Sequence, residues 1–170
     1  MTSPIRYGWA CWKTYLGRPE ACGFRTSAMT VLGNGVGEIG QHLERLGILE
    51  ARLSSQLRLR APVRDVLMTR SNIAGCYDML GRKEDALALL HEIYAHSVAL
   101  KLSSVEIYKS AVNLASALNS CNESDSYTEA KAFLRKQLPG ARHALGAEDG
   151  VYLKLRWAYS QSLYQNDGAS

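Results

Sequence analysis

The chain has 170 residues, of which 46% are hydrophobic and 21% charged, and its formal net charge is +4. This size and composition are those of a single globular domain, and they exclude a disordered or fibrous chain. Its uninterrupted apolar runs are far shorter than the roughly 18 to 20 residues of a membrane-spanning helix, so we expect no membrane segment.

The N-terminus has no clean apolar stretch that ends in a small-residue cleavage site, so we expect a cytoplasmic location. The four cysteines lie 11, 54 and 45 positions apart without a C-x-x-C pair. This spacing favours neither a zinc site nor a disulfide framework, and we predict no metal. A loose basic cluster, Arg52, Arg58, Arg60 and Arg64, is too sparse for a nucleic-acid-binding stripe and is expected to be a solvated helix face.

Residues 1–36 follow no repeat and are expected to form an irregular N-terminal segment. Trp9, Trp12 and Leu16 have the spacing of one short helical face, which Gly17 would end.

A glycine motif at Gly35, Gly37 and Gly40 fits G-x-G-x-x-G, the outline of a dinucleotide-binding fingerprint. The apolar run at residues 28–32 stands where the preceding strand would be. The chain then continues with a helical pattern instead of a second strand that ends in an acid. A dinucleotide-binding enzyme is therefore the third-ranked hypothesis, and we predict no cofactor and no catalytic residue.

From residue 37 onwards, apolar residues recur every three or four positions, as in Val105, Tyr108, Val112 and Ala115. This periodicity predicts amphipathic helices. The expected helices cover 37–58, 64–80, 83–101, 104–120, 126–145 and 150–165. Gly81 is expected to end the second of them in a left-handed conformation, and Pro139 should kink the fifth or end it early.

The helices share a repeated order of large apolar, small and aromatic positions. Ile73 and Leu114 lie 41 residues apart, as do Ala74 and Ala115, and Leu114 and Tyr159 lie 45 apart. A period of about 43 residues predicts stacked helical hairpins, because each hairpin buries its apolar face only against a neighbour.

This pattern resembles the tetratricopeptide repeat, in the roughly 42-residue form typical of kinesin light chains. The resemblance covers about residues 37–165 and is carried by residues 71–77 and 80–87 and by the connector at 144–149. Arg70 stands where the family has a tryptophan-like residue, and the last hairpin is unfinished. The resemblance implies an all-α fold, an α-α superhelix of tetratricopeptide-like hairpins, and a scaffold that binds proteins and is not an enzyme.

In such repeats an asparagine on the first helix of a hairpin often binds the backbone of a peptide in the concave groove, and Asn72 and Asn113 match this asparagine. Lys109 and Lys154 align with each other and would favour an acidic peptide. The remaining candidates on the same face are Ser116, Trp157 and Gln161. The two asparagines would otherwise satisfy hydrogen bonds between helices, and that alternative stays open.

The expected organisation is an irregular segment at 1–36, a repeat array at 37–165 and a tail at 166–170. The expected partner is a protein or peptide, with no nucleic acid and no membrane. The alternative is a structural repeat fragment that self-associates, because Tyr159, Leu163 and Tyr164 in the last helix do not make a polar outer face.

Overall fold

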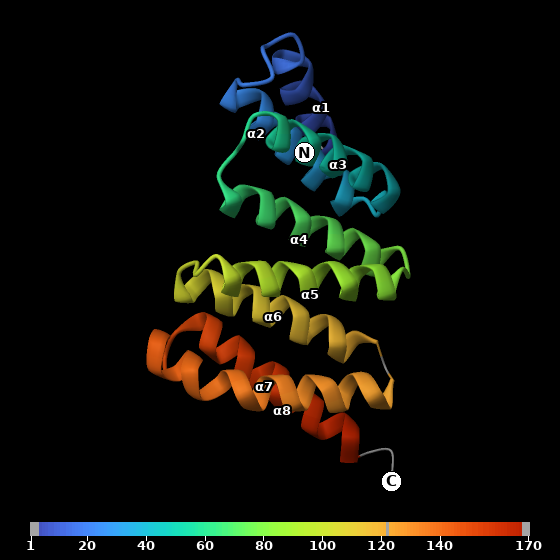
Figure 1. The fold of residues 1–170 in the computed structure, drawn as a ribbon. Helices are drawn as coiled ribbons and strands as arrows, with labels where there is room; N and C mark the ends of the chain where they lie inside the picture. Colours follow the sequence, from blue (N-terminus) through green and yellow to red (C-terminus); the bar gives the residue numbers. More distant parts are fainter. Residues whose placement is uncertain (1–3, 122, 168–170) are drawn as a thin grey trace. The chain divides into compact units, whose positions relative to one another are not determined.

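The computed structural model describes residues 4–121 and 123–167, and within these ranges it contains helices and no strand. The predicted helices are confirmed within a few residues, except that the first begins at His42 instead of residue 37. The helices are α1 (Pro4–Tyr15), α2 (Gly23–Glu38), α3 (His42–Arg58), α4 (Val63–Met79), α5 (Lys83–Ala99), α6 (Ser104–Ser120), α7 (Ser124–Leu145) and α8 (Gly150–Asp167) (Figure 1). None of the described helices is both long and apolar enough to cross a bilayer.

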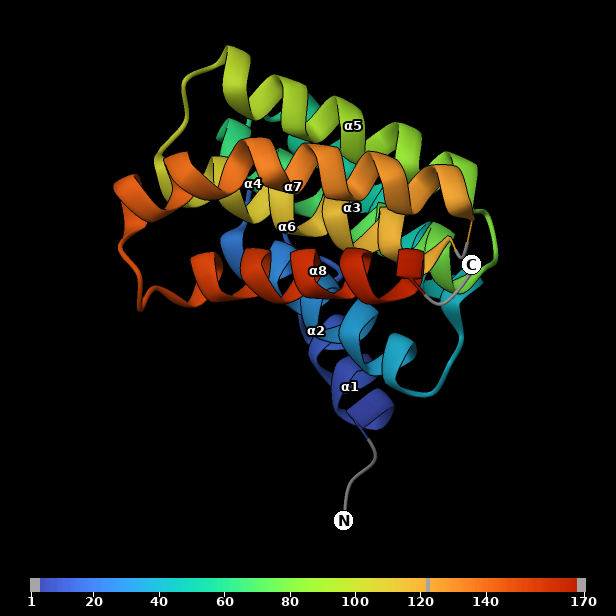
Figure 2. The ribbon, with the colours of Figure 1, turned by 90° about the horizontal axis from the view of Figure 1, so that it is seen from below.

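The chain divides into two compact units, a first unit of Met1–Arg82 and a second unit of Lys83–Ser170. In the first unit each helix packs against the next one along the chain, from α1 to α4. In the second unit, α5 to α8 pack in the same sequential way, and α6 also packs against α8. Figure 2 shows α7 lying along α6 and α8 in this second unit.

Two helices, α1 and α2, occupy most of the segment that was predicted to be irregular. Gly8 lets them pack closely, because a Cβ atom on this residue would lie 2.9 Å from the Cα of Leu32. The buried side of α2 carries Ala28, Leu32 and Val36, four residues apart. Burial against neighbouring helices thus overrides the weak helix propensity of glycine.

Three helix connections contain a glycine with a positive φ angle, at Gly40, Gly81 and Gly146. Gly81 has a φ of +75°, which confirms the predicted left-handed end of α4. Gly146 follows α7 with φ +95° and ψ 162°, a conformation that is essentially restricted to glycine.

Side-chain caps fix the start of two helices in the second unit. The Ser103 hydroxyl accepts a hydrogen bond from the Glu106 backbone N–H at 3.4 Å, and the Glu106 carboxylate accepts one from the Ser103 N–H at 3.2 Å. The Asp149 carboxylate accepts from the backbone N–H groups of Val151 and Tyr152, at 2.7 and 3.3 Å. These acceptors satisfy N–H groups that have no partner within the helix itself.

Small residues fill the centre of the second unit. Ala111 and Ala115 of α6 and Ala141 of α7 are fully buried, together with Leu134 and Leu155. Because alanine has a short side chain, the backbones of α6, α7 and α8 can approach one another closely. At one side of this core, Tyr94 of α5 and Phe133 of α7 meet edge to face with ring centroids 5.1 Å apart.

The C-terminal half departs from the sequence prediction in two places. Helix α7 begins at Ser124, two residues before the predicted start, and continues through Pro139 to Leu145, so the proline does not end it early. Residues 166 and 167 belong to α8 instead of a tail, and the rest of the predicted tail, 168–170, lies outside the described residues.

Candidate functional site

One face of α6 carries three of the predicted site residues. Lys109, Asn113 and Ser116 are all exposed, and their spacing places them within about 60° of one another around the helix axis. The opposite face of α6 is buried, as Leu114 and Leu118 show. The helix therefore presents a polar, hydrogen-bonding surface to solvent.

Helix α8 presents a more apolar surface. Lys154 is exposed, Trp157 is 62% exposed and Gln161 is half-buried, again within about 60° around the axis. Leu153 and Tyr164, which the sequence analysis did not assign to the site, are 42% and 84% exposed beside Trp157. Their spacing from Trp157, four and seven residues, was the signal that could have revealed this stripe.

A buried hydrogen bond joins α6 to α8. The Asn119 side-chain amide donates to the backbone carbonyl of Ala158 at 2.8 Å. Asn119 is 7% exposed, so the pairing of its Nδ2 offsets part of the cost of burying the amide, while its Oδ1 is buried without a partner. The contact positions the two exposed faces, although sequence reasoning did not single out this asparagine.

The buried positions of α6 and α8 correspond at an offset of 44 residues: Ala111 matches Leu155, and Leu114 matches Ala158. The sequence analysis had aligned these two helices at an offset of 45 residues. At the structural offset Trp157 takes the position of Asn113. Lys154 then stands one residue beyond the position of Lys109.

The remaining predicted residue, Asn72, lies in α4 of the first unit and is half-buried. It precedes the buried pair Ile73 and Ala74, as Asn113 precedes Leu114 and Ala115. The structure thus groups three candidates on α6 and three on α8, and it places Asn72 in the other unit.

The dinucleotide-binding hypothesis is wrong. Residues 28–32 lie within α2 and form no strand, and Gly35 and Gly37 belong to the same helix. Gly35 is buried, and a Cβ atom on Gly37 would lie 2.8 Å from the Cδ of Arg45. These glycines serve helix packing, and the strand, turn and helix that hold a pyrophosphate do not occur here.

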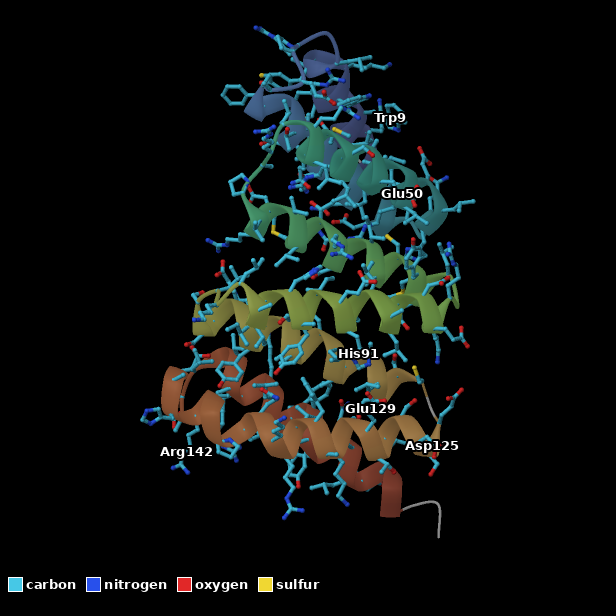
Figure 3. The ribbon with its side chains drawn as sticks, in the orientation of Figure 1. Trp9, Glu50, His91, Asp125, Glu129 and Arg142 are labelled. Carbon is cyan, nitrogen blue, oxygen red and sulfur yellow. The ribbon has the colours of Figure 1, made fainter. Side chains whose placement is uncertain are left out.

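Other reactive side chains are dispersed. Nε2 of His91 in α5 lies 3.4 Å from a carboxylate oxygen of Glu129 in α7 (Figure 3). No group of three metal-binding side chains occurs in the part of the chain that is described. The Cys76 thiol is buried, and burial raises its pKa, which the nearby Arg45 partly offsets. A thiol with a raised pKa is a poor nucleophile at neutral pH.

No family model matches this sequence, and neither does any curated protein. Several solved structures do have the same fold. A Podosopora anserina protein with nearly identical TPR-like repeats, assigned as a kinesin light chain, superposes with a TM-score of 0.76 and 18% identity over 96% of this chain and 78% of its own. A single-residue variant of that protein gives a TM-score of 0.72 and 17% identity over 99% of this chain and 90% of its own. BtubC (BKLC) from P. vanneervenii gives a TM-score of 0.66 and 14% identity over 98% of this chain and 72% of its own.

The predicted resemblance and fold class are confirmed by this likeness. The chain has the all-α fold of tetratricopeptide-like helical hairpins, with neighbours among kinesin light chain repeat proteins. Arrays of this kind generally mediate protein–protein interactions, because stacked hairpins provide an extended surface.

Proposed function

We propose that the chain is a cytoplasmic protein-interaction module that binds an extended segment of a partner protein along the exposed faces of α6 and α8. Asn113 hydrogen-bonds the backbone of that segment. Trp157 contacts an apolar side chain of it, and Lys109 and Lys154 favour acidic residues beside that side chain.

The observation that carries the proposal is the exposed apolar stripe on α8, a helix that is in contact with α6, whose exposed face is polar. Trp157 is 62% exposed, although an indole normally contributes its large area to a core or an interface. Ser116 and Gln161 add hydrogen-bonding groups on the same faces. An aromatic anchor with polar neighbours is typical of peptide-binding surfaces.

A peptide-array screen followed by titration of the selected peptides tests the proposal. Asn113→Ala should weaken binding about tenfold or more, which corresponds to a loss of roughly 1.4 kcal/mol. Asn34→Ala, at an exposed asparagine of α2, is the matched control and should bind as the parent does. Equal affinity of the two variants would contradict the role of Asn113.

The proposed preference for acidic peptides is tested by reversing the charge of the two lysines, with a separate control. Lys109→Glu together with Lys154→Glu should reduce the affinity for acidic peptides more at low salt than at high salt, because screening weakens exposed charges. Lys136→Glu changes an exposed lysine of α7 and should have a smaller effect. We propose the same backbone-binding role for Asn72 on α4, and Asn72→Ala tests it separately.

Self-association is the second candidate function, and the same stripe on α8 supports it. Tyr164 is 84% exposed, whereas Tyr159 and Leu163 are half-buried, so the stripe is narrower than the sequence indicated. Sedimentation at micromolar concentration distinguishes the two functions. A monomer that binds peptides supports the proposed module, and a dimer that Trp157→Ser dissociates supports self-association.

A further inference from the structure

A polar cleft of about 290 Å³ lies in the first unit, between the start of α2, the end of α3 and the start of α4. Hydroxyl groups of Thr26, Ser27 and Ser55 line it, together with the side chains of Arg52 and Gln56. Its volume is near the lower end of the range of small-molecule sites, about 300 to 1,000 Å³. The cleft therefore suits a small ligand or the end of a chain.

The Arg52 guanidinium has unused hydrogen-bond donors. The residue is only 6% exposed, and its Nε and Nη1 atoms are buried without a partner. Burial lowers the pKa of Arg52, and the nearby Asp65 partly opposes this effect, but an arginine remains charged at neutral pH. A buried charge without hydrogen bonds destabilises a fold unless something else compensates for it.

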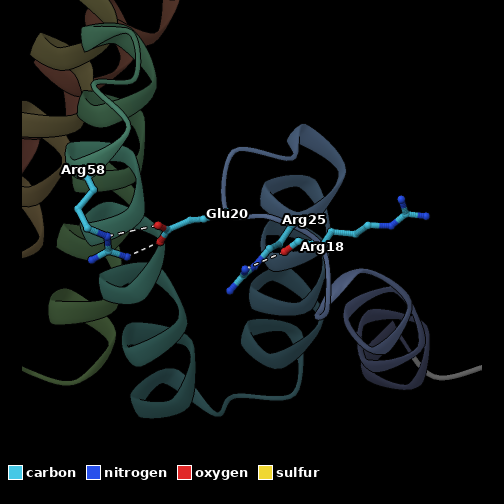
Figure 4. Close-up of polar contacts among 4 residues, drawn as sticks. All are labelled: Arg18, Glu20, Arg25 and Arg58. Atoms are coloured by element: carbon cyan, nitrogen blue, oxygen red, sulfur yellow. Dashed lines mark hydrogen bonds and ion pairs between the residues drawn. The ribbon is translucent and has the colours of Figure 1, made fainter.

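Two neighbouring arginines contrast with Arg52. The carboxylate of Glu20 accepts hydrogen bonds from Arg58, and the carbonyl of Arg18 accepts one from Arg25 at 2.9 Å (Figure 4). Both of these arginines thus have hydrogen-bond acceptors within the protein itself. An oxyanion is the ligand chemistry that would satisfy Arg52 in the same way.

A second unpaired group, on Gln56, restricts the chemistry of the ligand. The Gln56 side chain is 5% exposed and donates from Nε2 to the Asp65 carbonyl at 3.4 Å, while its Oε1 is buried without a partner. A ligand that accepts from Arg52 and also donates to Gln56 would pair both groups. The Asp65 carboxyl group also lines the cleft and favours a single negative charge over a phosphate dianion.

We propose that this cleft binds a carboxylate that carries an N–H or O–H donor on the adjacent carbon, as an acylated amino acid or a 2-hydroxy acid does. The carboxylate receives hydrogen bonds from Arg52 and from the hydroxyls of Thr26 and Ser27, because the single O–H of Ser55 is donated to Glu20. The adjacent donor binds Oε1 of Gln56. The site shares no residue with the surface on α6 and α8 and does not depend on the function proposed for it.

Titration of the ¹⁵N-labelled chain tests the site. N-acetylalanine should shift the backbone signals of Thr26, Ser27 and Ser55 and bind at least tenfold more tightly than its amide, which lacks the carboxylate. It should bind a few-fold more tightly than propionate, which lacks the donor. Equal binding of the amide, or tighter binding of inorganic phosphate, would overturn the assignment.

The source of the carboxylate is distinguished by N-acetyl-pentaalanine with a free C-terminus. Binding as tight as that of N-acetylalanine supports a chain end as ligand, and loss of binding supports a free small molecule. Either result keeps the carboxylate site, provided that N-acetylalanine itself binds.

Arg52→Met separates a binding role from a structural one. The variant should lose N-acetylalanine binding and, without ligand, should melt at the same or a higher temperature than the parent, because an unpaired buried charge is removed. A lower melting temperature would show that the fold itself uses the guanidinium and would overturn the proposal. Arg58→Gln is the control on the same helix and should bind N-acetylalanine as the parent does.

Discussion

Leu134→Ala tests the packing of the second unit, on which the positions of α6 and α8 depend. Leu134 is fully buried, and its neighbours in the core include Ala111, Ala115 and Ala158. Alanine side chains are too short to reach into a new cavity, so filling it would require whole helices to move. We therefore expect little relaxation around the truncated side chain.

The expected loss follows from that geometry. Removing three buried carbon atoms costs about 2.4 kcal/mol in transfer free energy, at about 0.8 kcal/mol for each. The unrelaxed cavity adds to this, so the unfolding free energy should fall by about 3 to 4 kcal/mol, in the range of roughly 2 to 5 for such substitutions. That is a large share of the stability of a small domain, about 5 to 15 kcal/mol in total.

Urea denaturation followed by tryptophan fluorescence measures the loss. Replacing Trp9 and Trp12 by phenylalanine leaves Trp157, which lies in α8, as the one tryptophan of the chain. Arg135→Ala, at the exposed neighbouring position, is the control and should change stability by less than about 0.5 kcal/mol. A loss below about 1 kcal/mol for Leu134→Ala would refute the tight packing described here.

Three further predictions concern single features. Gly146→Ala should destabilise the chain by about 1 to 3 kcal/mol in thermal melts, because a φ of +95° is strained for alanine, and no loss would contradict this conformation. Iodoacetamide at pH 8 should label Cys76 at least tenfold more slowly in the native protein than in urea, since burial raises its thiol pKa. Equal labelling rates in the native protein and in urea would exclude the burial of Cys76. Hydrogen bonds from Arg58 and then Ser55 lower the pKa of Glu20, so the ionised carboxylate stabilises the fold above about pH 4.3, and this effect is lost as the pH falls. Glu20→Gln should therefore lower the melting temperature at pH 7 and have no effect at pH 2.5. A difference in melting temperature that is the same at both pH values would exclude this linkage.

The sequence predicted the helices that have strong apolar periodicity, some of which also end at a glycine. α6 was predicted at 104–120 and has those bounds, because its buried positions are apolar or small, apart from Asn119. α2 was missed, because Gly33, Gly35 and Gly37 weaken the helical signal. Gly33 contacts Ile48, which belongs to the next helix, α3. A glycine in a helix–helix contact cannot be distinguished from a glycine in a loop without knowledge of the second helix.

The candidate site was predictable to the level of the helix face. Lys109 and Asn113 are exposed on one side of α6, as their spacing predicted. The alignment of α8 was displaced by one residue because Tyr159 was matched to Leu114, whereas Ala158 is the buried residue there. The unpaired atoms of Arg52 and Gln56 could not be predicted, since hydrogen-bond satisfaction depends on the surroundings of a side chain and not on its residue type.

The contact between Gly8 and Leu32 has a consequence for how this chain tolerates substitution. A Cβ atom on Gly8 would lie 2.9 Å from backbone, which cannot yield as the tip of a flexible side chain would. Any other amino acid at this position would push α1 away from α2. Random mutagenesis with selection for folded protein should therefore recover almost no changes at Gly8, even though the segment around it carries the weakest repeat signature of the chain.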